Sequence, residues 1–224
     1  MADAITRPRA EESSPTEGVS LIIDQVRHRG DAALRELTRQ FDGVEVVSLV
    51  VSHTDALAAL ERVPVRLRSA LEVAWDRILA YHQHERAPAG DFELDGILVR
   101  HLQRPVGRVG IYAPGGRARY PSTVLMCAAP ARVAGVGELT LVVPPGSNGT
   151  VADETLAAAA IAGVDHIYCV GGAQAIAALA FGTETIRPVD VIVGPGNKYV
   201  AEAKRQVSGW WASPPDTQVL PRWW

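Results

Sequence analysis

Four stretches decide the fold: RVGIYAPGG (108–116), ELTLVVPPG (138–146), HIYCVGGAQ (166–174) and VDVIVGPGN (189–197). Each opens with a short, almost wholly apolar run of β-forming residues and ends in a turn rich in glycine or proline. A helical pattern follows each stretch, as in STVLMCAAPARVAG at 122–135. Apolar strands that alternate with helices are typical of a parallel sheet with crossover helices on both faces. We therefore predict an α/β fold with a parallel-sheet domain at about residues 107–209.

The preceding stretch, residues 19–106, has a different pattern and is predicted to form the first part of another domain. Apolar residues at helical spacing predict helices at about 19–30 and 64–86, with Gly30 as a stop and Asp31 as a cap for a further helix. VEVVSLVVS at 44–52 is β-branched and predicted to be extended. Asp95-Gly96 lies between two apolar runs, which predicts a hairpin with a two-residue turn.

The two ends of the chain differ from both predicted domains. Residues 1–18 are polar and are predicted to be a flexible arm. Residues 210–224, WWASPPDTQVLPRWW, hold four of the five tryptophans together with three prolines and no regular period. We interpret this atypical tail as a break in composition rather than as an evolved domain, or alternatively as an apolar patch for a partner.

Composition excludes several classes of function. The 224 residues are 47% hydrophobic and 21% charged, which is ordinary for a soluble globular protein, and the net charge is −3. This charge gives no electrostatic case for binding nucleic acid or an anionic membrane. The first eighteen residues do not resemble a secretory signal, and the apolar runs are too short to span a bilayer. Two cysteines make no disulfide framework, so we expect a cytoplasmic location.

The four glycine- and proline-rich turns are predicted to meet at one edge of the sheet. Parallel strands with right-handed crossovers bring their carboxyl ends together, and open α/β folds bind ligands there. Tyr112, Gln174 and Asn197 belong to three of these turns. An aromatic ring and two amides suit a nucleotide or another flat, polar ligand. Local turn chemistry is the better explanation for any one turn alone, but four turns at one edge, three of them with a large polar or aromatic residue, favour a binding site. Neither a G-x-G-x-x-G fingerprint nor a phosphate loop is present to identify the ligand.

The histidines do not form a recognisable metal motif. His82 and His84 are two residues apart on a predicted helix and therefore point to different faces. Neither H-x-x-x-H nor C-x-x-C occurs in the sequence. We therefore assign no metal ligand and no catalytic acid or base to this chain.

Three of the same motifs resemble the histidinol dehydrogenase family: VGIYAPGGRARYPSTVLMCAAPARVAGV (109–136), YCVGGAQAIAALAFGTETI (168–186) and VDVIVGPGNKYVAEAKRQVSG (189–209). The resemblance extends over roughly residues 18–209. It implies a zinc-dependent oxidation of L-histidinol to L-histidine through an aldehyde, with NAD as cofactor, by intertwined homodimers that have two Rossmann-like domains. It also implies that Tyr112, Gln174 and Asn197 contact NAD.

The same resemblance implies that important parts lie elsewhere. The family's zinc ligands, which are a glutamine, an aspartate and two histidines, and its Glu–His catalytic pair belong to its second half. We therefore expect a chain that is truncated after about residue 209, has an incomplete first domain and is inactive alone, and our hypothesis for the truncation is a frameshift. Two alternatives stay open: a related dehydrogenase of another small alcohol, such as a sulfonated diol, and a non-enzymatic nucleotide-binding or dimerisation module.

Overall fold

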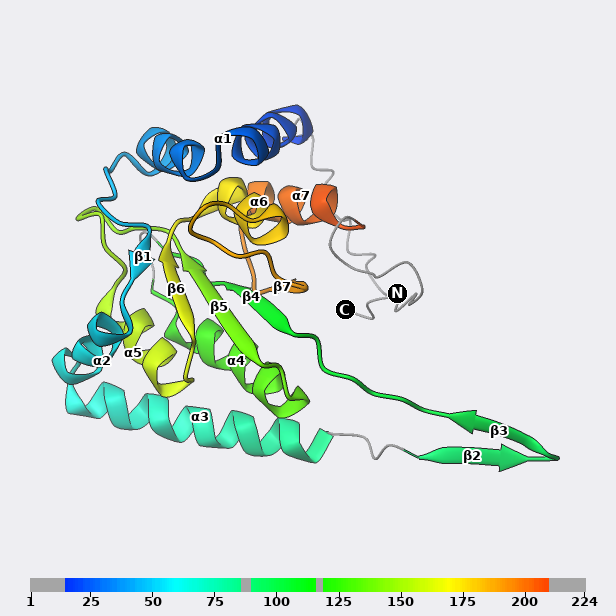
Figure 1. Ribbon diagram of the computed structural model, residues 1–224. Helices are drawn as coiled ribbons and strands as arrows, with labels where there is room; N and C mark the ends of the chain where they lie inside the picture. The colour runs from blue at the N-terminus through cyan, green and yellow to red at the C-terminus, as the bar shows by residue number, and fades with distance from the viewer. Residues whose placement is uncertain (1–14, 86–89, 116–118, 210–224) are drawn as a thin grey trace, which may run out of the picture.

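A computed structural model describes residues 15–85, 90–115 and 119–209, and its centre is a five-stranded sheet (Figure 1). The strands are β1 (Val50–Val51), β4 (Arg108–Tyr112), β5 (Glu138–Val143), β6 (His166–Cys169) and β7 (Val191–Val193). They lie in the order β1-β6-β5-β4-β7. Strands β4 to β7 are parallel, with Tyr112 opposite Val142, whereas β1 runs antiparallel to β6. The predicted parallel α/β sheet is therefore confirmed.

Four crossover helices cover the two faces of this sheet. They are α4 (Pro121–Ala134), α5 (Asp153–Ile161), α6 (Gly172–Phe181) and α7 (Lys198–Val207). Helices α6 and α7 share one apolar core with residues of the sheet, and α4 and α5 share the other. Leu141 of β5 and Ile176 of α6 are completely buried in these two cores. Cover on both faces explains why the strands are almost wholly apolar.

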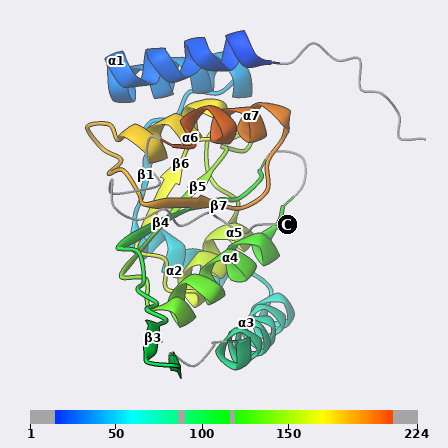
Figure 2. The ribbon, with the colours of Figure 1, turned by 90° about the vertical axis from the view of Figure 1, so that its right-hand side faces the viewer.

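The three N-terminal helices form outer layers on these crossover helices (Figures 1 and 2). They are α1 (Thr16–Asp42), α2 (His53–Arg62) and α3 (Val65–Glu85). Helix α1 packs on α6 and α7, α2 packs on α5, and α3 packs on α4 and α5. The described helices of the stretch predicted as a first domain thus share their cores with the sheet, and the same stretch adds strand β1. The predicted boundary near residue 107 itself stays a prediction.

The predicted break at Gly30 is present as a kink within α1. Gly30 has a φ of 51° and a ψ of −130°, a backbone conformation that favours glycine. The next residue, Asp31, was expected to cap a helix, but its carboxylate accepts hydrogen bonds from the hydroxyls of Thr183 and Thr185. Its N–H donates to the carboxylate of Glu184 at 2.7 Å. The kink therefore ties α1 to the loop that follows α6.

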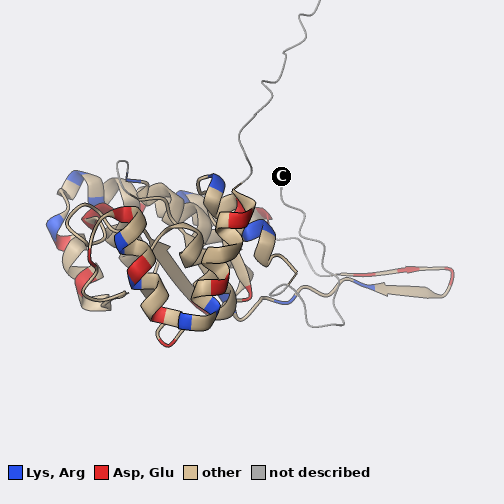
Figure 3. Ribbon diagram, turned by 90° about the horizontal axis from the view of Figure 1, so that it is seen from above, with Lys and Arg blue, Asp and Glu red and all other residues tan. Residues whose placement is uncertain are grey.

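The predicted hairpin is confirmed as β2 (Asp91–Leu94) and β3 (Ile97–Arg100), with Leu94 opposite Ile97. Both turn residues, Asp95 and Gly96, have positive φ, as a type I′ turn requires. The hairpin extends away from the sheet, and all eight of its strand residues are exposed (Figures 1 and 3). None of the helices in the described ranges is long and apolar enough to cross a membrane. Most of the predicted arm (1–14) and the whole predicted tail (210–224) lie outside the described residues.

Candidate functional site

The four glycine- and proline-rich turns lie at the carboxyl edge of the sheet, because β4 to β7 are parallel. From β4 the chain adds β5 and β6 on one side and then returns to place β7 on the other side. The strand order therefore changes direction between β4 and β7. In open α/β sheets, ligands bind in the crevice beyond the strand ends at such a point. Tyr112 is the last residue of β4, and Gly194 follows β7 directly.

Tyr112 connects the end of β4 to the turn after β6. Its side chain is buried, and its hydroxyl oxygen accepts a hydrogen bond of 3.2 Å from the backbone N–H of Gly172. Burial raises the pKa of Tyr112, and the carboxylate charge of Asp42 at the end of α1 adds to this effect. The phenol therefore stays protonated at neutral pH and keeps an O–H that can donate to another group.

Gln174 lies beside this contact, in the first turn of α6. Its exposed fraction is 1%, and within the described part of the chain neither Oε1 nor Nε2 has a hydrogen-bond partner. The side chain folds over Gly172, where a Cβ would lie 2.5 Å from Oε1. Since buried amide groups are nearly always hydrogen-bonded, an unpaired carboxamide at this edge suggests a partner that comes from outside the chain.

Asn197 is exposed and caps α7. Its Oδ1 accepts hydrogen bonds from the N–H groups of Tyr199 and Val200, at 3.0 and 3.1 Å. The cap uses the side-chain oxygen, so contact with a ligand would fall to the amide NH2 group. The turn before Asn197 touches the end of β4, because a Cβ at Gly194 would lie 2.1 Å from the carbonyl oxygen of Tyr112.

The structure therefore brings the three residues singled out from the sequence to one edge. Tyr112 and Gln174 meet at Gly172, and Asn197 belongs to the neighbouring turn that abuts Tyr112. Sequence reasoning missed Lys204, whose Nζ donates to the carbonyl oxygen of Gly194 at 2.6 Å. The sequence carried one signal for it, which was its distance from Asn197. Lys204 comes seven residues, or two helical turns, after Asn197, so both residues lie on the same face of α7.

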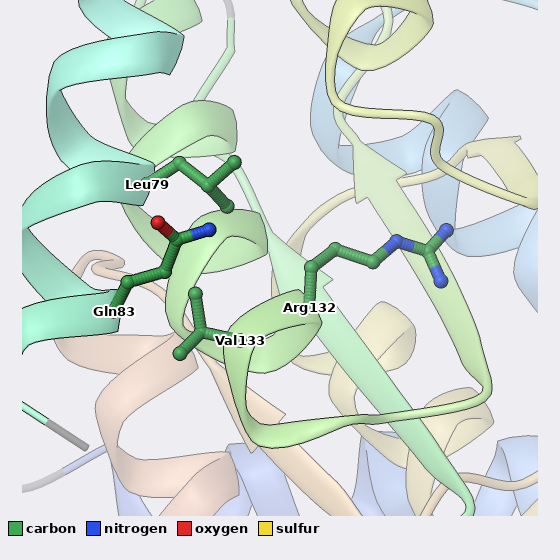
Figure 4. Close-up of a pocket in the computed structure, with 4 residues that line it drawn as sticks. All are labelled: Leu79, Gln83, Arg132 and Val133. Carbon is green, nitrogen blue, oxygen red and sulfur yellow. The ribbon is translucent and has the colours of Figure 1, made fainter.

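A hollow of the described structure lies elsewhere. A cavity of about 500 Å³ lies between α3 and the C-terminal part of α4, and it is lined by Leu79, Gln83, Arg132 and Val133 (Figure 4). This end of α4 leads into β5, so the cavity lies toward the opposite edge of the sheet. Arg132 donates there to the carbonyl of Gly163 and the carboxylate of Asp165. We interpret these contacts as structural ones.

The described residues give little support for a metal site or for a reactive cysteine. Among these residues, no group of three or more His, Cys, Asp and Glu side chains could hold a metal ion. His82, one of the two neighbouring histidines, pairs with Glu85 through Nδ1 at 2.7 Å. Burial raises the pKa of Cys127 to about 11 and that of Cys169 to about 12, so neither is a thiolate at neutral pH.

A parallel sheet covered on both faces, with polar side chains gathered where its strand order reverses, defines an open α/β protein with a candidate ligand site at that edge. Comparison with known proteins is more specific. The family model for histidinol dehydrogenase matches residues 5–213. The chain is 54% identical over 195 residues to the histidinol dehydrogenase of Aromatoleum aromaticum, a match that covers 85% of this chain and 44% of the relative. For the enzyme of Pseudomonas fluorescens the identity is 49% over 202 residues, covering 88% and 46%.

Comparison with solved structures agrees with these sequence matches. The crystal structure of histidinol dehydrogenase from Elizabethkingia anophelis superposes with a TM-score of 0.87 at 34% identity, over 92% of this chain and 48% of that one. The chain belongs to the histidinol dehydrogenase family. It spans slightly less than half the length of the relatives that it matches.

Proposed function

We propose that the carboxyl edge of the sheet binds NAD, as one part of an NAD-dependent dehydrogenase of L-histidinol. The observation that carries this proposal is Gln174, whose carboxamide is buried without a partner among the described residues. Leaving a buried donor or acceptor unpaired costs about 1–3 kcal/mol. A nucleotide carries amide, hydroxyl and phosphate groups, and it would pair with both atoms of this carboxamide.

Each of the three residues has a role in this proposal that follows from its contacts. The hydroxyl of Tyr112 is fixed by Gly172 and keeps a proton to donate. The amide NH2 of Asn197 lies at the start of α7, where the helix dipole also favours an anionic group such as phosphate. Bound NAD would supply the acceptor for hydride, and the residues of this chain would hold and orient it.

We assign zinc binding and acid–base catalysis to other parts of a complete enzyme. The described residues do not fit a zinc site, and we derive no step through zinc from them. We propose that oxidation of L-histidinol requires zinc ligands and an acid–base pair from a second half like that of the relatives, in a homodimer. This chain alone would then bind NAD without turning over L-histidinol.

The test of NAD binding is a substitution that separates stability from affinity. Gln174→Met keeps the shape of the side chain but removes both unpaired polar atoms. We expect this variant to unfold at a higher urea concentration and to bind NAD at least about tenfold more weakly by calorimetry. Thr38→Val is the matched control. Like Gln174, Thr38 is buried and has an unpaired polar group in the described structure, but it lies on α1, outside the proposed site. This control should also gain stability but bind NAD as the wild type does.

A second variant, Asn197→Asp, keeps the side-chain oxygen that caps α7 and removes the NH2 group. We expect unchanged stability and weaker NAD binding. An L-histidinol assay with NAD and zinc should yield no NADH from the chain alone. If the wild type fails to bind NAD, or if Gln174→Met binds it equally well, the proposed site is wrong. NADH formation by the chain alone would refute the proposed division of labour.

A further inference from the structure

Lys204 makes a contact that joins the end of α7 to the turn at its start. Its Nζ donates to the carbonyl oxygen of Gly194 at 2.6 Å, and the side chain is partly buried. Gly194 is the first residue of the Gly194–Asn197 turn and has a φ of 99°. The contact therefore ties the C-terminal part of α7 to the first residue of the β7–α7 connection, ten residues earlier in the chain.

The ammonium group of Lys204 lies in surroundings that are unusual for a charged group. Burial lowers the pKa of Lys204, and the thiol of Cys127 on α4 opposes this effect only where that thiol is ionised. Because the pKa of Cys127 is itself raised to about 11, that thiol is uncharged at neutral pH. Within the described ranges, no carboxylate forms an ion pair with Lys204. The carbonyl of Gly194 is thus the partner that the structure gives to a partly desolvated cation.

The turn that Lys204 holds is fitted closely to its neighbours. On one side, Gly194 lies against the backbone of Tyr112, where a Cβ would approach the carbonyl oxygen to 2.1 Å. On the other side, a Cβ at Gly196 would approach Cγ1 of Val200 to 2.2 Å. Asn197 closes the turn through its cap on α7. A displacement of Gly194 would therefore move Asn197 relative to Tyr112.

We propose that Lys204 is a positioning residue for the nucleotide site: by holding the carbonyl of Gly194, it fixes the Gly194–Asn197 turn and so presents the amide of Asn197 beside Tyr112. The part of this inference that concerns NAD rests on the proposed function. The part that concerns the turn does not, and it is measurable without any ligand.

The test uses Lys204→Met, which keeps the aliphatic stem and removes the ammonium. Arg205→Met is the matched control, since it removes a cation one residue later whose guanidinium pairs with Glu202. In the chain without ligand, Lys204→Met should raise the amide exchange rates of Tyr199 and Val200 about tenfold, because the cap of Asn197 loosens. Arg205→Met should leave both rates unchanged. Lys204→Arg keeps a charged donor and should restore part of the protection.

A double-mutant cycle then tests whether Lys204 acts through Asn197. Lys204→Met alone should weaken NAD binding about tenfold, the value of one well-placed hydrogen bond. In the Asn197→Asp background the same change should weaken binding less than about twofold, because the positioned amide is already gone. Unchanged exchange rates in Lys204→Met, or additive losses in the cycle, would overturn the proposal. If the wild type binds no NAD, the proposed function fails, and the exchange rates still decide whether Lys204 holds the turn.

Discussion

The central sheet and the β2–β3 hairpin both contain strands with large apolar residues, but the surroundings of these residues are opposite. In β5, ELTLVV, five of the six residues are buried, and Leu141 has no exposed surface. In the hairpin, DFEL and ILVR are exposed at every position, and the exposed fraction of Ile97 is 66%. The difference teaches that turn chemistry and strand pairing are enough to define a hairpin, whereas burial depends on helices that come from elsewhere in the chain.

This contrast predicts its largest effect for one substitution made in both regions. Leu141→Ala should lower the free energy of unfolding by about 3–4 kcal/mol, because it removes buried methyl groups and leaves a cavity in a core that is covered on both faces. Leu98→Ala, in the exposed strand β3, should change it by less than about 0.5 kcal/mol. Urea denaturation followed by circular dichroism measures both values. Equal losses would show that the hairpin is buried in solution.

The next effect concerns two glycines with positive φ. Gly194→Ala combines a left-handed backbone with a clash against the carbonyl oxygen of Tyr112, and it should cost about 2–3 kcal/mol. Gly43→Ala has the same kind of backbone, but no atom lies within 4 Å of the added Cβ, so it should cost about 1 kcal/mol. Thermal unfolding of the two variants gives the comparison. A larger loss for Gly43→Ala would mean that the β7 turn adjusts easily, and it would weaken the inferred role of Lys204.

The sheet and its polar edge were predictable from local patterns. Short apolar strands that end in glycine-rich turns specify a parallel sheet, and parallel strands place Tyr112, Gln174 and Asn197 at one edge. The hairpin was predictable for a different local reason, since Asp95-Gly96 suits the positive φ values of its turn.

Long-range packing was not predictable in the same way. An apolar stripe shows that a helix buries one face, but it does not show which partner covers that face. For this reason the packing of α1 on α6 and α7, and of α3 on α4 and α5, could not be predicted from the apolar stripes of these helices. The contact of Lys204 with Gly194 was missed because a lysine near the end of a helix is ordinarily solvated. The unpaired amide of Gln174 depends on its surroundings in space and leaves no trace in the sequence.

A smaller effect should appear in the pH dependence of the sheet region. Arg62 of α2 donates two hydrogen bonds, of 2.9 and 2.6 Å, to the carboxylate of Asp153 on α5, and these lower the pKa of Asp153. A carboxyl group whose pKa is lowered by folding stabilises the fold above its unfolded value of about 3.9, and this contribution is lost as the pH falls below it. Both side chains are partly exposed, so solvent screening keeps the effect modest.

We therefore expect Arg62→Met to have a lower urea midpoint than the wild type at pH 7. The two midpoints should begin to converge as the pH falls below about 4 and should meet once the pH is below the lowered pKa of Asp153 in the wild type, where Asp153 is protonated in both proteins. Arg66→Met, which removes a cation from the start of α3, controls for the change in net charge. A difference between Arg62→Met and the wild type that stays constant down to acidic pH would assign the loss to the packing of the arginine stem instead.

The smallest expected effect tests whether the hairpin is independent of the sheet. Asp95 has a φ of 51°, which glycine adopts more readily than aspartate does, so Asp95→Gly should favour the turn locally. Amide exchange in β2 and β3 should become slower, while the urea midpoint of the whole chain should move by no more than the equivalent of about 0.5 kcal/mol. This combination is expected because every strand residue of the hairpin is exposed, so its local stability is not transmitted to the core. A clear rise of the global midpoint would contradict that independence, since a stronger turn can stabilise the sheet only if the two regions fold as one unit.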